Sequence, residues 1–321
     1  MMDVQAVLAG VLAGERRAVG RAISMVEALG PEGREIVRGL HPHAGHAERV
    51  GLTGAPGVGK STLASALVRT LRDDGRTVGV VSVDPTSPFT RGAVLGDRIR
   101  LNEHFVDRGV FIRSMATRGH AGGLAEATAD AVLVLDAAGY DIVLVETVGA
   151  GQTEVEVSQL VETVALVLMP GGGDAIQAIK AGLMEIPDVL VVNKADRPGA
   201  DLMRAELEGA LGLVSWEGGW RPPIVSTRAL DGEGVGELAA AIARHRAHLA
   251  DDGALEARRR DGLARQLRSL ALDRFGRRVD EVLEAGFVEG LVDEVLAGRL
   301  DPASAVDEVV ERADRPARSG S

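Results

Sequence analysis

The stretch "RVGLTGAPGVGKSTLASALVRTLRDDG", residues 49 to 75, decides the fold of this chain of 321 residues. It opens with a short apolar run that is typical of a buried strand, and from residue 60 onward apolar side chains recur at helical spacing until Gly75. Between the two lies "GAPGVGKST", residues 54 to 62, which matches the pattern G-x-x-x-x-G-K-[ST]. A strand, a glycine-rich loop and a helix in this order predict a loop whose backbone N–H groups surround phosphate oxygens.

The loop predicts separate roles for two side chains. Lys60 is expected to reach the outer phosphates of a nucleotide, and the Ser61 hydroxyl is expected to bind Mg²⁺. The helix that follows adds the positive end of its dipole. The residues of the loop that we expect to bind the nucleotide are Gly54, Ala55, Pro56, Gly57, Val58, Gly59, Lys60, Ser61 and Thr62.

Further apolar runs follow this loop, and helical patterns separate them. The runs are continuous rather than alternating, as expected of parallel strands that are buried on both faces. We expect strands within residues 77–84, 109–115, 141–147, 163–170, 188–196 and 222–227, and a helix over residues 123–139. This alternation predicts an α/β fold with a mostly parallel, doubly wound sheet, and the glycine-rich loop indicates that the fold is of the P-loop type.

Helical patterns flank the α/β segment at both ends of the chain. We expect an N-terminal helical extension over residues 1–45, the α/β domain over residues 46–249, and a C-terminal helical dimerisation arm with a disordered tail over residues 250–321. The apolar stripes of the C-terminal helices must be buried somewhere. A dimer interface and packing against the same chain are both open.

Composition limits the classes of function. The net charge of −11 argues against nucleic acid as a partner, because proteins that bind it usually carry a basic face. With no cysteine, disulfides and thiolate metal sites are excluded, which is natural in a reducing cytoplasm. We find neither a signal peptide nor a membrane span, so we expect a cytoplasmic protein without a membrane partner.

A second motif, "NKAD" at residues 193 to 196, indicates which base is bound. The Asp196 carboxylate can accept hydrogen bonds from N1 and the 2-amino group of guanine, whereas adenine offers no such pair of donors. The stem of Lys194 would pack over the purine ring, and Asn193 completes the motif. Downstream of a phosphate-binding loop, this tetrapeptide predicts GTP and GDP rather than adenine nucleotides.

Acidic residues near the strand ends are candidates for the metal and for the attacking water. Asp84 ends the second expected strand, and Asp97 follows in the same Pro- and Gly-rich loop. Glu146 ends a later strand. Carboxylates at such positions can hold Mg²⁺ or orient water, so we treat Asp84, Asp97 and Glu146 as candidates for both roles.

The residues from Glu146 to Gly149 read "ETVG", which resembles the D-x-x-G of GTPases with Glu in place of Asp. Gly149 would bring its backbone N–H to the γ-phosphate, so that the loop distinguishes GTP from GDP. Gln152 is a candidate for orienting the attacking water, although its offset from the glycine differs from that of small GTPases.

Lysine usage draws attention to one more position. The chain has 36 basic residues but only three lysines, and two of them, Lys60 and Lys194, are already assigned to the nucleotide. The third, Lys180, lies in "GGGDAIQAIKAGL", residues 171 to 183. Lysine and arginine are not interchangeable where a compact point charge is needed, which favours a specific role for Lys180.

Taken together, these motifs and the helical ends closely resemble the MeaB/ArgK family, over about residues 1–312. The resemblance implies slow GTP hydrolysis, a homodimer, and a chaperone of adenosylcobalamin-dependent acyl-CoA mutases, above all methylmalonyl-CoA mutase. Such a chaperone gates cobalamin loading and protects or reactivates the mutase, and an adenosyltransferase is a candidate second partner. The family's third switch region carries a lysine that matches Lys180, which would pair with Asp84, Asp97 or Glu146.

One segment departs from the family pattern. The loop that supports the guanine usually reads like Ser-Ala-Leu, but here the sequence is "STRALDGEG" from Ser226, with Arg228 where a small residue is expected. The resemblance assigns Thr227, Arg228 and Ala229 to the nucleotide site. The backbone N–H of Ala229 would contact the guanine oxygen, and Arg228 would cover the base.

Three alternative functions remain open from the sequence. A nickel-metallochaperone-type GTPase would need metal ligands near the switches, but the chain has no cysteine, and its only histidine cluster is His41, His43 and His46 in a linker. A small-molecule kinase should lack the N-K-x-D motif. A binding module that holds the nucleotide with little turnover differs from a switch GTPase only in degree.

Overall fold

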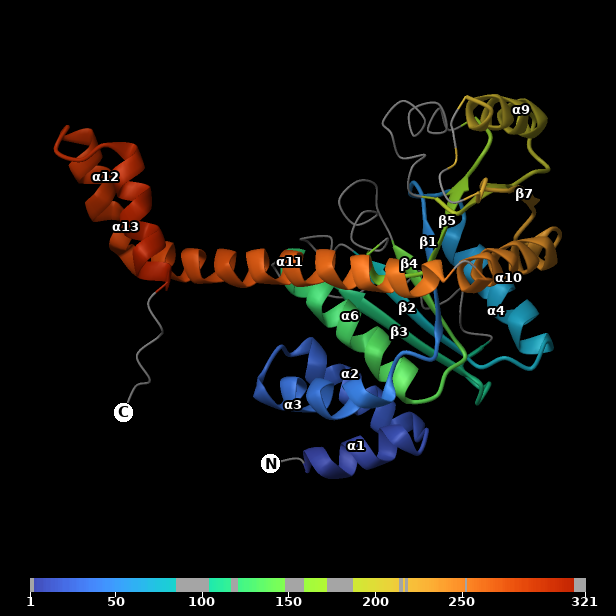
Figure 1. Cartoon of the computed structure of the whole chain (residues 1–321), viewed down its shortest axis with the longest axis horizontal. Coiled ribbons are helices and arrows are strands. Elements are labelled where there is room, and N and C mark those ends of the chain that lie inside the picture. Colours follow the sequence, from blue (N-terminus) through green and yellow to red (C-terminus); the bar gives the residue numbers. More distant parts are fainter. Residues whose placement is uncertain are drawn as a thin grey trace. The chain divides into compact units, whose positions relative to one another are not determined.

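Seven parallel strands form the centre of the fold (Figure 1). The computed structural model describes residues 3–84, 104–116, 121–147, 159–171, 187–213, 216, 219–251 and 253–314. The chain divides into two compact units, Met1–Ala264 and Arg265–Ser321. The sheet and everything that positions the candidate site belong to the first unit.

The sheet has the strand order β3-β2-β4-β1-β5-β6-β7, and every strand pair is parallel. This confirms the expected α/β class with a doubly wound parallel sheet. The strands are β1 (Glu48–Thr53), β2 (Val78–Asp84), β3 (Val110–Ala116), β4 (Ile142–Thr147), β5 (Thr163–Leu168), β6 (Val189–Asn193) and β7 (Ile224–Thr227). The register pairs Glu146 of β4 with Leu52 of β1 and with Ser82 of β2. The carboxyl ends of β1, β2 and β4 therefore meet beside the glycine-rich loop.

One face of the sheet is covered by the N-terminal helices and α6. These helices are α1 (Val4–Leu12), α2 (Arg16–Glu27), α3 (Pro31–Leu40) and α6 (Ala121–Ala137), and a short 3-10 turn, His41–His43, follows α3. Their apolar stripes share one buried cluster with β2, β3 and β4, which includes Val19 and Ile23 of α2 and Leu135 of α6. Leu207 of α9 (Ala200–Leu211) lies in a further buried cluster with residues of β5, β6 and β7.

The opposite face packs against α4 (Lys60–Asp73) and α10 (Val235–Asp251). Leu63 and Leu67 of α4, Leu238 of α10 and Val50 and Leu52 of β1 are all buried in one cluster. This packing fixes α4 directly after the glycine-rich loop, so that the first turn of the helix starts where β1 ends. In the described ranges, no helix is long and apolar enough to cross a membrane.

Four acidic residues lie at the amino-terminal edge of the sheet, opposite the nucleotide loop. They are Glu48, Asp141, Glu162 and Asp188, each at the start of a strand or directly before one. Glu162 accepts hydrogen bonds from the backbone N–H of Arg49 (2.7 Å) and from the Arg49 and Arg259 side chains. Because the first N–H groups of strands lack ladder partners, such carboxylates satisfy them.

The described residues of the second unit form helices. The helix α11 (Ala254–Val282) begins in the first unit and continues into the second. A π-turn (Leu283–Phe287) with Gly286 at φ 73° separates it from α12 (Val288–Leu296), and α13 (Pro302–Asp314) follows. Val292, Leu296, Val306 and Val310 of these helices are exposed.

Candidate nucleotide site

The glycine-rich loop adopts a backbone that only glycine accepts easily. Gly54 has φ 137°, and a Cβ atom there would lie 2.2 Å from the carbonyl oxygen of Val167. Gly59, with φ 99°, caps α4, and a Cβ atom there would lie 2.5 Å from Nδ2 of Asn193. Both positions combine positive φ with close approach of a neighbouring strand, which explains the glycines of the motif.

The side chain of Lys60 lies inside this loop. The residue is only 5% exposed, and its ammonium donates hydrogen bonds to the carbonyl oxygens of Gly54 and Ala55, the latter at 2.9 Å. A compact ammonium on a flexible stem fits between two carbonyls, whereas a planar guanidinium does not. The structure thus places the lysine charge within the loop that was predicted to surround phosphates.

Ser61 connects the loop to the end of β4. Its hydroxyl donates a hydrogen bond of 2.6 Å to Oε1 of Glu146, and the Ser82 hydroxyl of β2 lies 3.5 Å from Oε2 of the same carboxylate. Glu146 is fully buried, and Ser61 and Ser82 are almost so. The β2–β4 register pairs Ser82 with Glu146, and Ser61 reaches the same carboxylate from the first turn of α4.

Asn193 joins three segments of the site. Its Nδ2 donates to the carbonyl of Val58 in the loop (2.8 Å), and its Oδ1 accepts from the Thr227 hydroxyl (3.0 Å) and from the backbone N–H of Ala229 (3.2 Å). Because the side chain is buried, these bonds are shielded from water and hold the loop, β6 and the end of β7 together.

The lysine and the aspartate of the "NKAD" motif lie at the surface of the same region. Lys194 adopts a positive φ of 56°, and its ammonium donates to the carbonyl of Gly57 (2.6 Å) and lies 3.5 Å from the sulfur of Met169. Asp196 is exposed. The geometry therefore brings the phosphate loop and the base-reading motif side by side.

The loop after β7 is held by its own charges. The Arg228 side chain forms ion pairs with Asp231, at 3.8 Å, and with Glu233, and its backbone N–H donates to the Glu233 carbonyl at 2.9 Å. The N–H of Ala229 donates to Asn193, as described above. The guanidinium of Arg228 therefore binds acidic residues of its own loop. These two ion pairs were not predicted from the sequence.

Several predicted residues lie outside the described part of the chain. These are Asp97, Gly149, Gln152 and Lys180. Asp84 ends β2 in register with Ala116, but only its backbone is described. The predicted roles of these five residues remain predictions.

Ser61 and Glu146 offer ligands suited to Mg²⁺. A hydroxyl and a carboxylate 2.6 Å apart are the hard oxygen donors that this ion prefers. Mg²⁺ is usually held by one or two protein oxygens, with phosphates and water completing the octahedron. Among the described residues, no group of three His, Cys, Asp or Glu side chains could hold a metal ion.

Ser82 is a member of the site that the sequence analysis missed. It stands as a single hydroxyl within the apolar run "VGVVSVD" of β2, two residues before Asp84. The signal was present, because a lone polar residue in a strand buried on both faces needs a buried partner. The identity of that partner depends on the β2–β4 register, which the sequence does not give.

Comparison with known proteins places these features in a family. Residues 19–284 match the model of the family described as methylmalonyl Co-A mutase-associated GTPase MeaB. A relative in Pyrococcus abyssi, whose name assigns it to the GTPases, is 48% identical over 301 residues, which cover 93% of each chain. The GTPase ArgK of Escherichia coli is 37% identical over 251 residues, or 76% of each chain.

A more distant relative and a crystal structure are also similar to this chain over most of its length. The mitochondrial methylmalonic aciduria type A homolog of Caenorhabditis elegans is 32% identical over 335 residues, covering 96% of this chain and 82% of that protein. A crystal structure of an LAO/AO transport system kinase has a TM-score of 0.71 and 26% identity, covering 97% of this chain and 98% of that one.

Proposed function

We infer the function from one premise: this chain belongs to the MeaB family of methylmalonyl Co-A mutase-associated GTPases. It is a GTPase that binds guanine nucleotides. We propose that it acts as a chaperone of an adenosylcobalamin-dependent acyl-CoA mutase, with methylmalonyl-CoA mutase as the first candidate. In this role GTP binding and hydrolysis gate the loading of cobalamin, and the protein protects or reactivates the mutase.

The contact between Ser61 and Glu146 is the observation that best supports a switch. It joins the residue expected to bind Mg²⁺ to the end of strand β4, where the "ETVG" segment begins. A Mg²⁺ ion bound to the Ser61 hydroxyl oxygen would also attract the Glu146 carboxylate, because both are hard oxygen ligands for this ion. The position of Glu146 would then depend on the nucleotide, and the segment after it would report that state to a partner.

The remaining roles in hydrolysis follow from the predicted motifs. Lys60 neutralises charge on the outer phosphates, and bound Mg²⁺ supplies electrostatic stabilisation of the same oxygens. Asp84, Asp97 and Glu146 share the tasks of holding the ion and orienting water. Gly149 contacts the γ-phosphate, and Gln152 assists the attacking water.

We further propose that the protein is a homodimer and that an adenosyltransferase is a second partner. Lys180 would relay the nucleotide state to the mutase by pairing with a switch carboxylate in one state and releasing it in the other. We therefore expect Lys180→Ala to retain GTP affinity and to lose part of the response to the mutase. Lys180→Arg keeps the charge but not the compact ammonium, so it should restore this response only in part.

The decisive experiment measures GTP turnover by the purified protein, alone and with a purified adenosylcobalamin-dependent acyl-CoA mutase. Slow turnover that the mutase accelerates at least about 10-fold would support a partner-gated switch. The Lys60→Ala variant controls for contaminating phosphatases. Rapid turnover alone, with no response to methylmalonyl-CoA, isobutyryl-CoA or ethylmalonyl-CoA mutase, would refute the chaperone function and favour the kinase or metallochaperone alternatives.

A further inference from the structure

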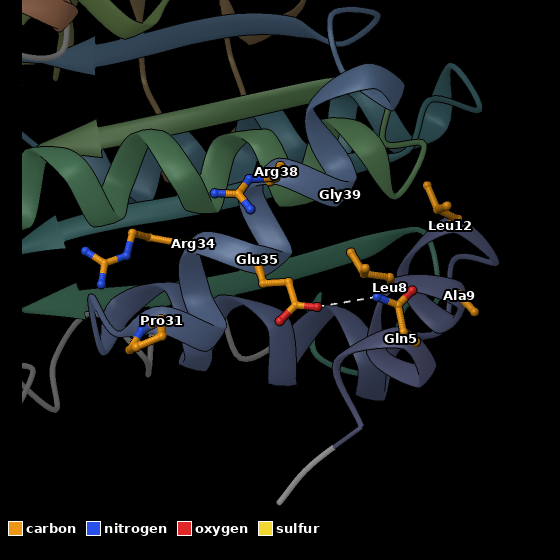
Figure 2. A pocket seen from close by; sticks show the side chains of 9 residues that line it. All are labelled: Gln5, Leu8, Ala9, Leu12, Pro31, Arg34, Glu35, Arg38 and Gly39. Atoms are coloured by element: carbon orange, nitrogen blue, oxygen red, sulfur yellow. Dashed lines mark hydrogen bonds between the residues drawn. The ribbon is translucent and has the colours of Figure 1, made fainter.

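A groove lies between the first and third helices, outside the nucleotide site. Residues of α1 and α3 line it, and its volume is about 790 Å³ (Figure 2). None of its lining residues belongs to the glycine-rich loop, to the "NKAD" motif or to the carboxylates discussed above. The activity of the GTPase domain therefore leaves this groove without a role.

The floor of the groove is apolar and held by packing. Leu8 lies against the buried cluster beneath α1 and α3, and a Cβ atom at Gly39 would come within 2.8 Å of its methyl groups. The two helices therefore approach closely, with glycine at the crossing. Beside them, Ala9 is exposed and the side chain of Leu12 is 44% exposed, which leaves an apolar surface that a partner can cover.

The rim of the groove carries two arginines that make no internal pair. Arg34 and Arg38 are exposed and one helical turn apart on α3, and Figure 2 shows both projecting from that helix. Neither guanidinium has a hydrogen bond or an ion pair with any residue that the structure describes. The intervening Glu35 accepts a hydrogen bond from Nε2 of Gln5 at 3.4 Å, which turns its charge toward α1.

These arginines differ from those that stabilise the fold. Arg49 binds the buried carboxylate of Glu162 through two N–H groups. Arg258 binds the buried carboxylate of Asp188 in the same way. In a chain of net charge −11, two unpaired guanidiniums beside an exposed leucine form a local basic and apolar surface. A guanidinium binds carboxylates through a planar fork, so this rim is suited to acidic side chains.

We propose that the α1–α3 groove binds an acidic amphipathic helix of a partner protein. Carboxylates four residues apart on such a helix lie about one turn apart, roughly 5.4 Å along its axis, which matches the spacing of Arg34 and Arg38. Its apolar stripe would cover Leu8, Ala9 and Leu12, in the mode by which grooves recognise helices. The inference does not depend on the chaperone proposal, because it rests on this surface alone.

The test uses a fluorescently labelled synthetic helix of four turns, with leucines at i, i+3, i+4 and i+7 and glutamates flanking them. Its anisotropy is measured with the full-length protein at low and high ionic strength. A second peptide has every glutamate replaced by lysine. We expect saturable, salt-sensitive binding of the acidic peptide by the unaltered protein, and none of the lysine peptide.

Two variants then assign the binding to the groove. Arg34→Glu combined with Arg38→Glu should weaken binding of the acidic peptide at least about 10-fold and should gain binding of the lysine peptide. Leu12→Asp should weaken binding of the acidic peptide, because it places a charge in the apolar surface beside the groove. Arg108→Glu, an exposed arginine before β3, is the matched control and should change nothing. GTP turnover reports that each variant is folded, and it should be unaltered because these residues lie outside the nucleotide site.

The proposal is overturned if the acidic peptide does not bind, or if it binds the double arginine variant as tightly as the unaltered protein. It is also overturned if sedimentation shows a self-associated protein that the same double variant converts to a monomer. That result would identify a second copy of this chain as the occupant. The proposal is supported if the unaltered protein binds the acidic peptide and the double arginine variant binds the lysine peptide instead.

Discussion

Lysine and arginine are divided between two tasks in this protein. The two lysines that the structure describes, Lys60 and Lys194, both donate to carbonyls of the glycine-rich loop. Buried carboxylates such as Glu162 and Asp188 are instead bound by arginines through two N–H groups. A compact ammonium enters a ring of backbone oxygens, and a planar fork matches a carboxylate, so the geometry of each site explains the residue.

Replacement of Lys60 should therefore lower GTP turnover even when the positive charge is kept. We expect both Lys60→Ala and Lys60→Arg to lower GTP turnover on the order of 100-fold or more, because a preorganised charge near the outer phosphates is lost or displaced. Turnover under saturating GTP measures the effect, and circular dichroism checks the fold. Near-normal turnover of Lys60→Arg would show that the enclosed position of the ammonium is unimportant.

The exposed carboxylate of Asp196 should set the choice of base. Asp196→Asn removes two charge-assisted hydrogen bonds to guanine, so we expect GTP affinity to fall at least about 10-fold. The new amide N–H can donate to the 2-carbonyl of xanthine, and the variant should gain affinity for xanthosine triphosphate. Calorimetric titration with both nucleotides tests this. Asp201→Asn, in the first turn of α9, is the control and should leave both affinities unaltered.

At the scale of elements, the start of α11 is fixed to the sheet by adjacent arginines. Arg258 binds Asp188 at 2.9 and 2.6 Å, and Arg259 binds Glu162 at 2.8 Å. Each carboxylate lies directly before a strand, β6 or β5, and Asp188 also accepts the backbone N–H of Val164. Burial raises the pKa of Asp188, and Arg258 and the Val164 amide oppose this rise.

Loss of one partner from this buried pair should be costly. Arg258→Met leaves the Asp188 charge with less compensation, so we expect the free energy of unfolding of the first unit to fall by about 3 kcal/mol. Urea denaturation followed by tryptophan fluorescence measures it, since Trp220 donates to the Asp188 carbonyl at 2.8 Å. The exposed pair Arg221–Glu208 provides the control, and Arg221→Met should cost less than about 1 kcal/mol. Equal effects of the two variants would contradict this account.

The strands and the phosphate loop were predictable because local patterns determine them. Buried parallel strands are continuous apolar runs, and the glycines of the loop mark positions that exclude a Cβ atom. The carboxylate–arginine pairs were not predicted, because their members lie far apart in the chain, as with Glu48 and Arg246 at 2.8 Å. Likewise, the link from Asn193 to Val58 and Ala229 depends on strand order, which no local pattern contains.

At the scale of the whole molecule, one buried histidine should make stability depend on pH. His245 of α10 is 1% exposed, accepts from or donates to the Thr163 hydroxyl at 2.9 Å, and lies 3.3 Å from Asp188. Trp220 packs against its ring. Burial, together with the positive charge of Arg258 and the nearby His248, lowers the pKa of His245 to about 3.

The direction of the pH effect follows from proton binding. In the unfolded chain a histidine binds a proton below about pH 6.5, whereas folded His245 does so only near pH 3. The unfolded state thus binds more protons between these values, and the free energy of unfolding should fall as the pH drops from about 6.5, by up to about 1.4 kcal/mol per pH unit. The raised pKa of Asp188 acts in the opposite direction, because the folded state then binds the proton more tightly.

A variant comparison separates the two groups. His245→Gln keeps Asp188 and Arg258 but has no imidazole to protonate, so the difference in unfolding free energy between the two proteins should shrink as the pH falls from 7.5 to about 5. Urea denaturation at each pH, followed by tryptophan fluorescence, gives this difference. His43→Gln, at an exposed position, should retain the full pH dependence of the unaltered protein. A difference that stays constant across this range would mean that His245 takes up its proton while the sheet is still folded, and that Asp188 compensates the buried charge.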